Sequence, residues 1–224
     1  MLMHVDVLVL APSRRELEGV LPIEHKMITI AGKQVFSQCI GVGKVLSALN
    51  AQKAIMTYNP SLVVLVGYCG ALVQSLDILD PVLAIEVKQY DLDLCAFGLQ
   101  RGFTFDQHMH VVSGCCSLVA PPLTGFRQVV LGSADRFLLR SYRETHPFLT
   151  DEMCLQVSDM EGFSVALAAS IHAVDCSILR VVSDDAQGRR PKKFSSFARE
   201  ASKKLNQGLF QLLEEPREKS PTSL

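Results

Sequence analysis

The feature that most constrains the fold is a series of short apolar runs, rich in Val, Ile and Leu and bounded by Gly, Pro, Asn or Asp. Continuous apolar runs of about 4 to 8 residues are typical of strands that are buried on both faces, as in parallel or mixed sheets. The runs are Val5–Leu10, Val35–Ile40, Leu62–Val66, Pro81–Val87, Val129–Leu131 and Ser177–Val182. We therefore expect a central sheet that is covered on both faces.

Segments with helical periodicity separate these runs. Apolar residues recur at helical spacing across Val45–Met56, Glu161–Ala173 and Phe194–Glu215. In the first of these segments, Leu46, Leu49 and Ile55 fall near one stripe. Strands that alternate with helices predict an α/β protein, here a single-domain three-layer α/β/α fold with a central mixed sheet. We expect the domain to span residues 1–215 and the polar segment 216–224 to be a disordered tail.

Composition argues against several classes of function. The formal net charge of −1 supplies no field for holding a polyanion, so nucleic acid is not an expected partner. The apolar runs are far shorter than the roughly 20 residues that a membrane span requires, and the first residues lack the basic region of a signal peptide. Seven cysteines without a Cys-x-x-Cys pair are typical of reduced thiols. We expect a soluble cytoplasmic protein with no metal and no cofactor.

The most informative segment is the apolar run that ends in Ser183, Asp184 and Asp185. Ligands of open α/β sheets bind beyond the carboxyl ends of strands, so Asp184 is well placed for catalysis. Its apolar surroundings disfavour the charged form of the carboxyl group, which suits a general acid. The alternative is a turn or a helix cap, for which Ser-Asp-Asp is equally suited, and position alone favours that alternative.

Two glutamates allow both structural and functional interpretations. Ser158-x-x-Glu161 matches the capping-box pattern, so Glu161 either caps the following helix or accepts hydrogen bonds from ribose hydroxyls. Glu16 should lie in the first turn of a helix after the first strand, where it either interacts with the helix dipole or activates water. From these residues alone the structural roles are favoured.

Taken in order, these segments resemble the nucleoside phosphorylase and nucleosidase superfamily, and within it the methylthioadenosine/S-adenosylhomocysteine nucleosidases and the futalosine hydrolases. The resemblance runs from Val5 to about Leu213. The similar strings are Gly41-Val-Gly-Lys44, Val66-Gly-Tyr-Cys-Gly-Ala71, Asp91-Leu-Asp-Leu-Cys-Ala-Phe-Gly98, Ser133-Ala-Asp-Arg-Phe137, Asp159-Met-Glu161 and Arg180-Val-Val-Ser-Asp184. Each is weak alone, but their common order is specific.

The resemblance implies roles in the hydrolysis of the bond between a purine base and ribose. Asp184, oriented by Ser183, would protonate the imidazole-ring nitrogen of the purine so that the base leaves in neutral form. Glu16 would orient the attacking water. Glu161 would bind the ribose hydroxyls, with Met160 packed against the sugar.

The remaining expected contacts surround the base and the entrance. By the same resemblance, Phe137 would stack on the base and Leu138 would hold it through backbone groups. Phe194, next to the loop before the last helix, would cover the pocket, and Tyr68 would lie at its edge. Phe97 matches a residue that the neighbouring subunit lends in family dimers, which implies a homodimer.

The resemblance also bears on the nucleophile. Leu65 and Tyr68 stand where phosphorolytic relatives have the Arg and Ser of a phosphate site, which favours water over phosphate. Arg14 and Arg15 keep phosphate as an alternative nucleophile, because basic residues near the first strand bind phosphate in the phosphorolytic branch.

The substrate is expected among purine nucleosides. The opening Ala11-Pro-Ser-Arg-Arg-Glu16 resembles that of futalosine hydrolases, which implies futalosine or aminodeoxyfutalosine as the substrate and a place in menaquinone synthesis. The alternatives are a methylthioadenosine/S-adenosylhomocysteine nucleosidase and an inactive family member that binds a nucleoside. The resemblance does not separate adenine from hypoxanthine.

Overall fold

Each apolar run identified in the sequence forms a strand, and each segment with helical periodicity forms a helix. The computed structural model describes residues 4–21 and 26–214. Its strands are β1 (Val7–Ala11), β2 (Met27–Ile30), β3 (Lys33–Cys39), β4 (Leu62–Ala71), β5 (Pro81–Gln89), β6 (Phe103–Phe105), β7 (Val111–Ser113), β8 (Cys115–Ser117), β9 (Arg127–Ser133), β10 (Val157–Asp159) and β11 (Asp175–Asp184). Its helices are α1 (Arg14–Leu17), α2 (Lys44–Tyr58), the 3-10 turn η1 (Cys95–Phe97), α3 (Arg140–Thr145), α4 (Phe148–Asp151), α5 (Gly162–Ile171) and α6 (Phe194–Glu214). The expected disordered tail over 216–224 lies outside the described residues, and the domain limits stay a prediction.

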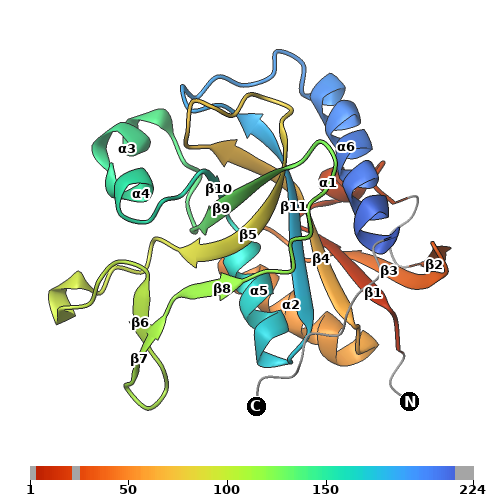
Figure 1. Cartoon of the computed structure of the whole chain (residues 1–224), viewed down its shortest axis with the longest axis horizontal. Helices are drawn as coiled ribbons and strands as arrows, with labels where there is room; N and C mark the ends of the chain where they lie inside the picture. Colours follow the sequence, from red (N-terminus) through yellow and green to blue (C-terminus); the bar gives the residue numbers. More distant parts are fainter. Residues whose placement is uncertain (1–3, 22–25, 215–224) are drawn as a thin grey trace.

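The described strands form one mixed sheet of nine and a separate β6–β7 hairpin. The order across the sheet is β10-β9-β5-β11-β4-β1-β3-β2, with β8 paired to β5. Strand β11 is parallel to β4 and antiparallel to β5. Strand β10 pairs with both β9 and β4, so this part of the sheet closes on itself. The β6–β7 hairpin projects away from the sheet (Figure 1).

Side chains that alternate along the central strands build two apolar layers. In β1, Leu8 and Leu10 belong to the cluster that includes residues of α2 and α5, whereas Val7 and Val9 belong to the cluster that includes residues of α6. This alternation follows from the period of two in an extended strand. Helices α2 and α5 therefore cover one face of the sheet and α6 covers the other (Figure 1). The expected three-layer α/β/α fold with a mixed sheet is confirmed.

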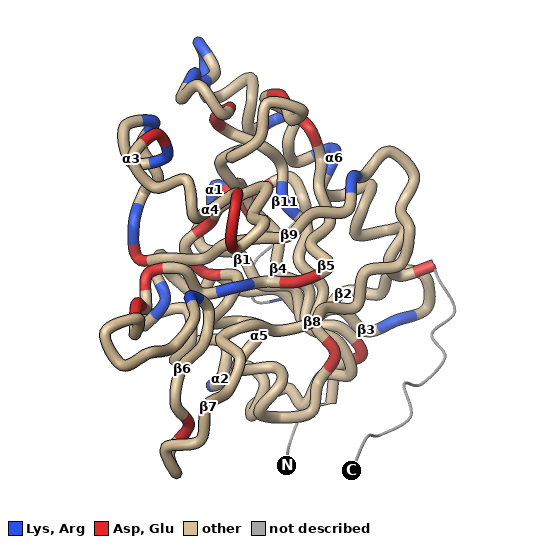
Figure 2. Tube along the Cα trace, turned by 60° about the vertical axis from the view of Figure 1, so that its left-hand side comes forward, with Lys and Arg blue, Asp and Glu red and all other residues tan. Residues whose placement is uncertain are grey.

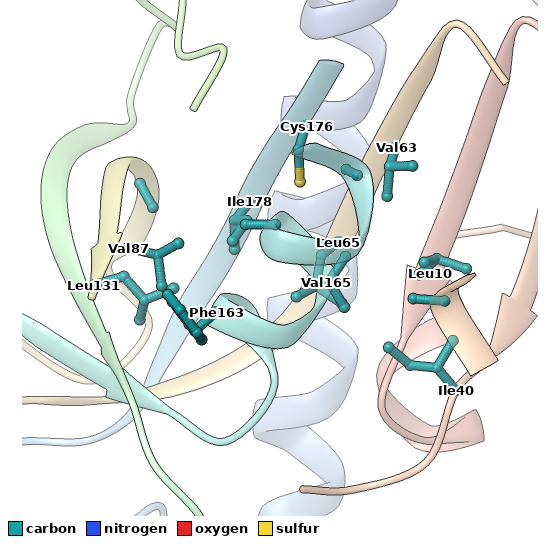
Figure 3. Packing of buried hydrophobic residues seen from close by; sticks show 14 of the residues in the cluster. Leu10, Ile40, Val63, Leu65, Val87, Leu131, Phe163, Val165, Cys176 and Ile178 are labelled. Carbon is teal, nitrogen blue, oxygen red and sulfur yellow. The ribbon is translucent and has the colours of Figure 1, made fainter. Parts of the chain in front are cut away.

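Helix α5 is buried along most of its length, although Leu167 and Ile171 are exposed. From this helix, Phe163 and Val165 join the cluster that contains Leu131 of β9 and Ile178 of β11 (Figure 3). Helix α6 is amphipathic, and Leu205, like its other buried residues, faces the opposite side of the sheet. Burying one leucine side chain contributes about 1.5 to 3 kcal/mol, so these two helices hold the outer layers in place.

Helix α2 differs from its sequence pattern. Ile55 is buried as the pattern indicates, but Leu46 and Leu49 are 50% and 62% exposed. The small residues Ala51 and Ala54 face the interior instead, because they allow a close approach to α5 and the sheet. The outer surface of α2 is consequently apolar.

The surface carries charges of both signs. In Figure 2, acidic and basic segments are interspersed on α3 and around α6. No helix in residues 4–21 and 26–214 has the length and apolar character needed to cross a bilayer.

We predict that Leu205→Ala lowers the free energy of unfolding by about 2 to 5 kcal/mol, because the cavity left under α6 adds to the lost transfer free energy. Leu205 is fully buried. Urea unfolding followed by circular dichroism measures the effect. The control is Gln207→Ala, an exposed position on the same helix that should change the free energy by less than about 0.5 kcal/mol. Equal effects of the two variants would contradict the assigned packing of α6.

Candidate active site

A cavity of about 270 Å³ opens beside the ends of β4, β10 and β11. The predicted site residues that line it are Glu16, Tyr68, Phe137, Leu138, Met160, Glu161, Ser183, Asp184 and Phe194. Their segments are far apart in the sequence, and the sheet topology brings them together. Phe97 does not line the cavity. It lies on η1 and is 73% exposed, so its expected role in a neighbouring subunit stays a prediction.

A buried guanidinium group organises the floor of the site. The Arg180 side chain is only 1% exposed and forms an ion pair with Asp159, in which Nε donates to Oδ2 at 3.1 Å. Its Nη2 lies 3.7 Å from Oε2 of Glu161. A buried charge of this kind is tolerated only with such compensation. Among the described residues, Nη1 of Arg180 has no hydrogen-bond partner.

Asp159, which the sequence reasoning did not select, also caps α5. The backbone N–H of Gly162 donates to both Asp159 carboxylate oxygens, at 3.1 and 3.0 Å, and the N–H of Phe163 donates to Ser133 Oγ at 2.9 Å. The capping-box interpretation of Ser158 and Glu161 is therefore wrong, since the Glu161 side chain makes no capping hydrogen bond. The Glu161 carboxylate is left available to the cavity.

Glu161 combines burial with an opening to the cavity. Its Oε1 accepts a hydrogen bond from the backbone N–H of Gly43 at 3.0 Å. Burial, reinforced by the negative charge of Asp159, raises the pKa of Glu161 to about 7, although Arg180 and the Gly43 N–H oppose the rise. A carboxylate in this position is a strong acceptor for hydroxyl groups of a ligand.

Glu16 lies in the first turn of α1, as predicted, and its carboxylate is held at both oxygens. Ser13 Oγ donates to Oε1 at 2.8 Å, and the N–H of Tyr68 donates to Oε2 at 3.0 Å. Desolvation raises the pKa of Glu16, and the positive charge of Arg180 counteracts part of that effect. A carboxylate whose pKa is raised can accept a proton near neutral pH.

Gly67 explains how Glu16 and Arg180 approach one another. A Cβ atom at Gly67 would overlap Arg180 Nη1 and would stand 2.5 Å from Glu16 Oε2. Only glycine fits between these groups. The donor Nη1 and the acceptor Oε2 therefore lie on either side of Gly67, and the absence of a side chain lets the positive charge of Arg180 act on the Glu16 carboxylate.

Asp184 has a charged partner that the sequence reasoning missed. Its Oδ1 accepts a hydrogen bond from Ser183 Oγ at 3.0 Å, and its Oδ2 accepts one from Arg143 Nη2 at 2.6 Å. The Arg143 and Asp184 side chains are 8% and 7% exposed. The expectation of purely apolar surroundings for Asp184 is wrong, because α3 places a guanidinium group beside it.

Aromatic side chains cover the rest of the cavity. Tyr68 packs edge-on against Phe194 and Phe197, with ring centroids 5.9 and 5.0 Å away, and its hydroxyl donates to the Arg15 carbonyl at 3.2 Å. Phe137 is 52% exposed, and the guanidinium group of Arg190 lies over its ring, 4.7 Å from the centroid. Such surfaces suit a flat aromatic ring.

Comparisons with known proteins identify the relatives of this chain. The sequence profile of the phosphorylase superfamily matches residues 22–214. The chain is 30% identical over 171 residues to the aminodeoxyfutalosine nucleosidase of Helicobacter pylori, covering 74% of this chain and 73% of that protein. It is 28% identical to the 5′-methylthioadenosine/S-adenosylhomocysteine nucleosidase of a Shewanella species, covering 87% of each chain. The solved futalosine hydrolase of Helicobacter pylori superposes with a TM-score of 0.75 at 24% identity, covering 92% of this chain and 98% of that one.

We predict that Glu161→Gln gains stability relative to the wild type as the pH rises. The pKa of Glu161 is raised in the folded protein from 4.5 to about 7, so the wild type is stabilised by the bound proton below pH 4.5 and loses that contribution as the pH approaches 7. Between pH 4.5 and pH 7, the difference in unfolding free energy between Glu161→Gln and the wild type should change by on the order of 2 kcal/mol. Thermal unfolding from pH 4 to 8 measures it, with the exposed Glu18→Gln as the control. A difference that is independent of pH would contradict the environment described for Glu161.

Proposed function

The chain belongs to the phosphorylase superfamily, and from this membership we propose that it is a purine nucleosidase that hydrolyses the bond between the base and ribose. The observation that carries the proposal is the presence of Glu16, Glu161 and Asp184 around one cavity. Relatives that share this family carry the names of nucleosidases, which are N-glycosyl hydrolases.

Each carboxyl group has a distinct task in the proposed reaction. Asp184, oriented by Ser183, gives a proton to N7 of the purine, and the electrons of the breaking C1′–N9 bond pass to the base. Water oriented by Glu16 attacks C1′, and its proton passes to Glu16. Glu161 accepts hydrogen bonds from the ribose hydroxyls. The oxocarbenium-like transition state of this cleavage requires both a leaving group that is made neutral and a nucleophile on the opposite face.

Contacts to the base and the sugar complete the proposed substrate pocket. Phe137 stacks on the purine, and the backbone of Leu138 holds its edge. Met160, which lines the cavity beside Glu161, packs against the ribose. Phe194 and Tyr68 cover the entrance, which excludes bulk water from the reacting bond.

Charge supports water over phosphate as the nucleophile. The floor around Arg180 carries the carboxylates of Asp159, Glu161 and Glu16, so this buried guanidinium group is already compensated and offers little attraction to a phosphate ion. Arg136, which lines the cavity, stacks over the ring of Tyr142. Leu65 is fully buried in the core, and neither Arg14 nor Arg15 lines the cavity.

The surroundings of the entrance support a futalosine-type nucleoside over a methylthioadenosine-type one. A second cleft of about 630 Å³ shares Phe194 with the site cavity and is lined by Arg15, Arg199 and Lys203 together with Glu18. Futalosine-type nucleosides carry a benzoate on the 5′ side of the ribose, and a cationic cleft beside the entrance can accept that carboxylate. This substrate would place the enzyme in menaquinone synthesis and in the cytoplasm.

We also propose that the enzyme acts as a homodimer. The outer surface of α2 exposes Val45, Leu46 and Leu49, which are 50% to 71% exposed, and such a surface is typical of a protein interface. Phe97 is equally exposed and lies outside its own cavity, so a second subunit is the site to which it can contribute.

We predict that the purified protein releases free purine in phosphate-free buffer. The assay offers futalosine, aminodeoxyfutalosine, methylthioadenosine and S-adenosylhomocysteine separately and measures the released base. A futalosine-type nucleoside should give the highest kcat/KM. Turnover that depends on added phosphate would indicate a phosphorylase. Binding of nucleosides without release from any of the four would indicate an inactive member of the family.

We predict that Asp184→Asn retains the fold but keeps less than a tenth of the wild-type kcat. A positioned acid contributes about 10²–10⁴-fold to the rate, and an amide of the same shape cannot give up a proton in its place. The matched control is Asp175→Asn at the opposite end of β11, which should keep wild-type turnover. If Asp184→Asn is as active as this control, the acid is another group.

A further inference from the structure

Asp91 does not line the site cavity, but it joins two of the segments that form the cavity wall. It follows β5, and its Oδ1 accepts a hydrogen bond from Lys44 Nζ at 2.5 Å. Its Oδ2 accepts one from the backbone N–H of Asp135 at 2.8 Å. The Lys44 and Asp91 side chains are 18% and 25% exposed, so water screens this ion pair less than a pair at the open surface. One carboxylate therefore connects the start of α2 to the segment after β9.

A second contact links the same two segments directly. Asp135 Oδ1 accepts a hydrogen bond from the backbone N–H of Lys44 at 2.6 Å. A Cβ atom at Gly43 would lie 3.0 Å from this oxygen, and Gly43 has a φ of 88°, which favours glycine. The turn before α2 is therefore shaped to meet the Asp135 carboxylate. We call Lys44, Asp91 and Asp135 the Asp91 network.

Both segments held by the Asp91 network continue into the cavity wall. Next to Lys44, the backbone N–H of Gly43 donates to Glu161 Oε1 at 3.0 Å. On the other side, Phe137 lies two residues after Asp135 and lines the cavity. A shift of the turn before α2 would therefore withdraw the Gly43 N–H from the Glu161 carboxylate.

Among the described residues, the groups that act on the Glu161 carboxylate come from four segments. Asp159 on β10 and Arg180 on β11 hold each other in an ion pair, and Glu16 on α1 has hydrogen bonds of its own. The fourth group is the Gly43 N–H, and its position depends on the Asp91 network. A backbone N–H that donates to a carboxylate stabilises the charged form.

We propose that Asp91 is a positioning residue for the reaction assigned to this cavity, a statement that rests on the proposed nucleosidase function. The Asp91 network keeps the Gly43 N–H on Glu161, so that the ribose-binding carboxylate stays charged and oriented toward the sugar. Asp91 acts only through the turn before α2 and takes no part in proton transfer.

The test measures kcat/KM of Asp91→Asn against pH, with the nucleoside that the wild type cleaves best. The amide replaces one of the two acceptor oxygens and removes the charge that holds Lys44. The Gly43 N–H then leaves Glu161, whose pKa is already raised to about 7 and rises further. The acid limb of kcat/KM should move up by about one pH unit. Relative to the wild type, kcat/KM should fall to about one tenth at pH 6 and return to within about 3-fold at pH 9.

The matched control is Asp6→Asn, because Asp6 also joins two segments through a carboxylate. Its Oδ2 accepts a hydrogen bond from the backbone N–H of Gln34 at 2.7 Å, but it precedes β1 and so lies at the opposite end of that strand from the cavity. This variant should keep the wild-type pH profile. If Asp91→Asn does not fold, Lys44→Met replaces it. That variant keeps the backbone contact to Asp135 and should move the acid limb in the same direction by a smaller amount.

An NMR titration of the Glu161 carboxyl carbon measures the same effect without turnover. Protein labelled with ¹³C in its glutamate side chains is titrated from pH 5 to 9, and Glu161→Gln identifies the signal. The midpoint should be higher in Asp91→Asn than in the wild type by about one pH unit and unchanged in Asp6→Asn.

An unchanged midpoint in Asp91→Asn, or a loss of kcat/KM that is equal at every pH, would overturn the proposal and leave the nucleosidase function intact. Failure of the wild type to release purine from any nucleoside would overturn the proposed function. The titration of Glu161 would then still decide whether Asp91 positions this carboxylate.

Discussion

The buried charge of Arg180 is the interaction on which the site depends. A guanidinium group that is almost wholly removed from water must be compensated by anions, and Asp159 supplies the main one. Asp159 in turn caps α5, so the same carboxylate fixes a helix and orients the cation. Glu161 and Glu16 are then placed at its two free sides. The same carboxylate therefore stabilises the fold and positions the charged groups of the site.

The two ends of the cavity use positive charge differently. Arg180 lies beside Glu161 and close to Glu16, and its buried Nη1 has no hydrogen-bond partner among the described residues. Arg143 has its two Nη atoms engaged by Asp184 and by two backbone carbonyls.

Much of the fold and part of the site could be predicted from the sequence. The central strands and long helices follow from apolar periodicity, and the ends of β4 and β11 follow from their glycines and carboxylates. Arg143 could not be found this way, because it lies on a short polar helix whose pattern resembles any exposed segment. Asp159 was not selected as the helix cap because the capping-box pattern pointed to Ser158 and Glu161 instead. The short strands β6 to β8 and β10 lack a periodic signal, since three residues cannot display a period.

Strand β10 determines how the protein loses its site when it unfolds locally. It is only three residues long and hydrogen-bonds to both β9 and β4. Asp159 is its last residue, and Glu161 lies two residues further on. Neither neighbour can separate from the closed part of the sheet without breaking β10. Amide hydrogens on both sides of it should accordingly exchange in a single cooperative opening event. Partially unfolded molecules in which β10 is released would have no residual catalytic site. Insertions in the projecting β6–β7 hairpin, which forms a separate sheet, would leave the pairing of β10 unchanged.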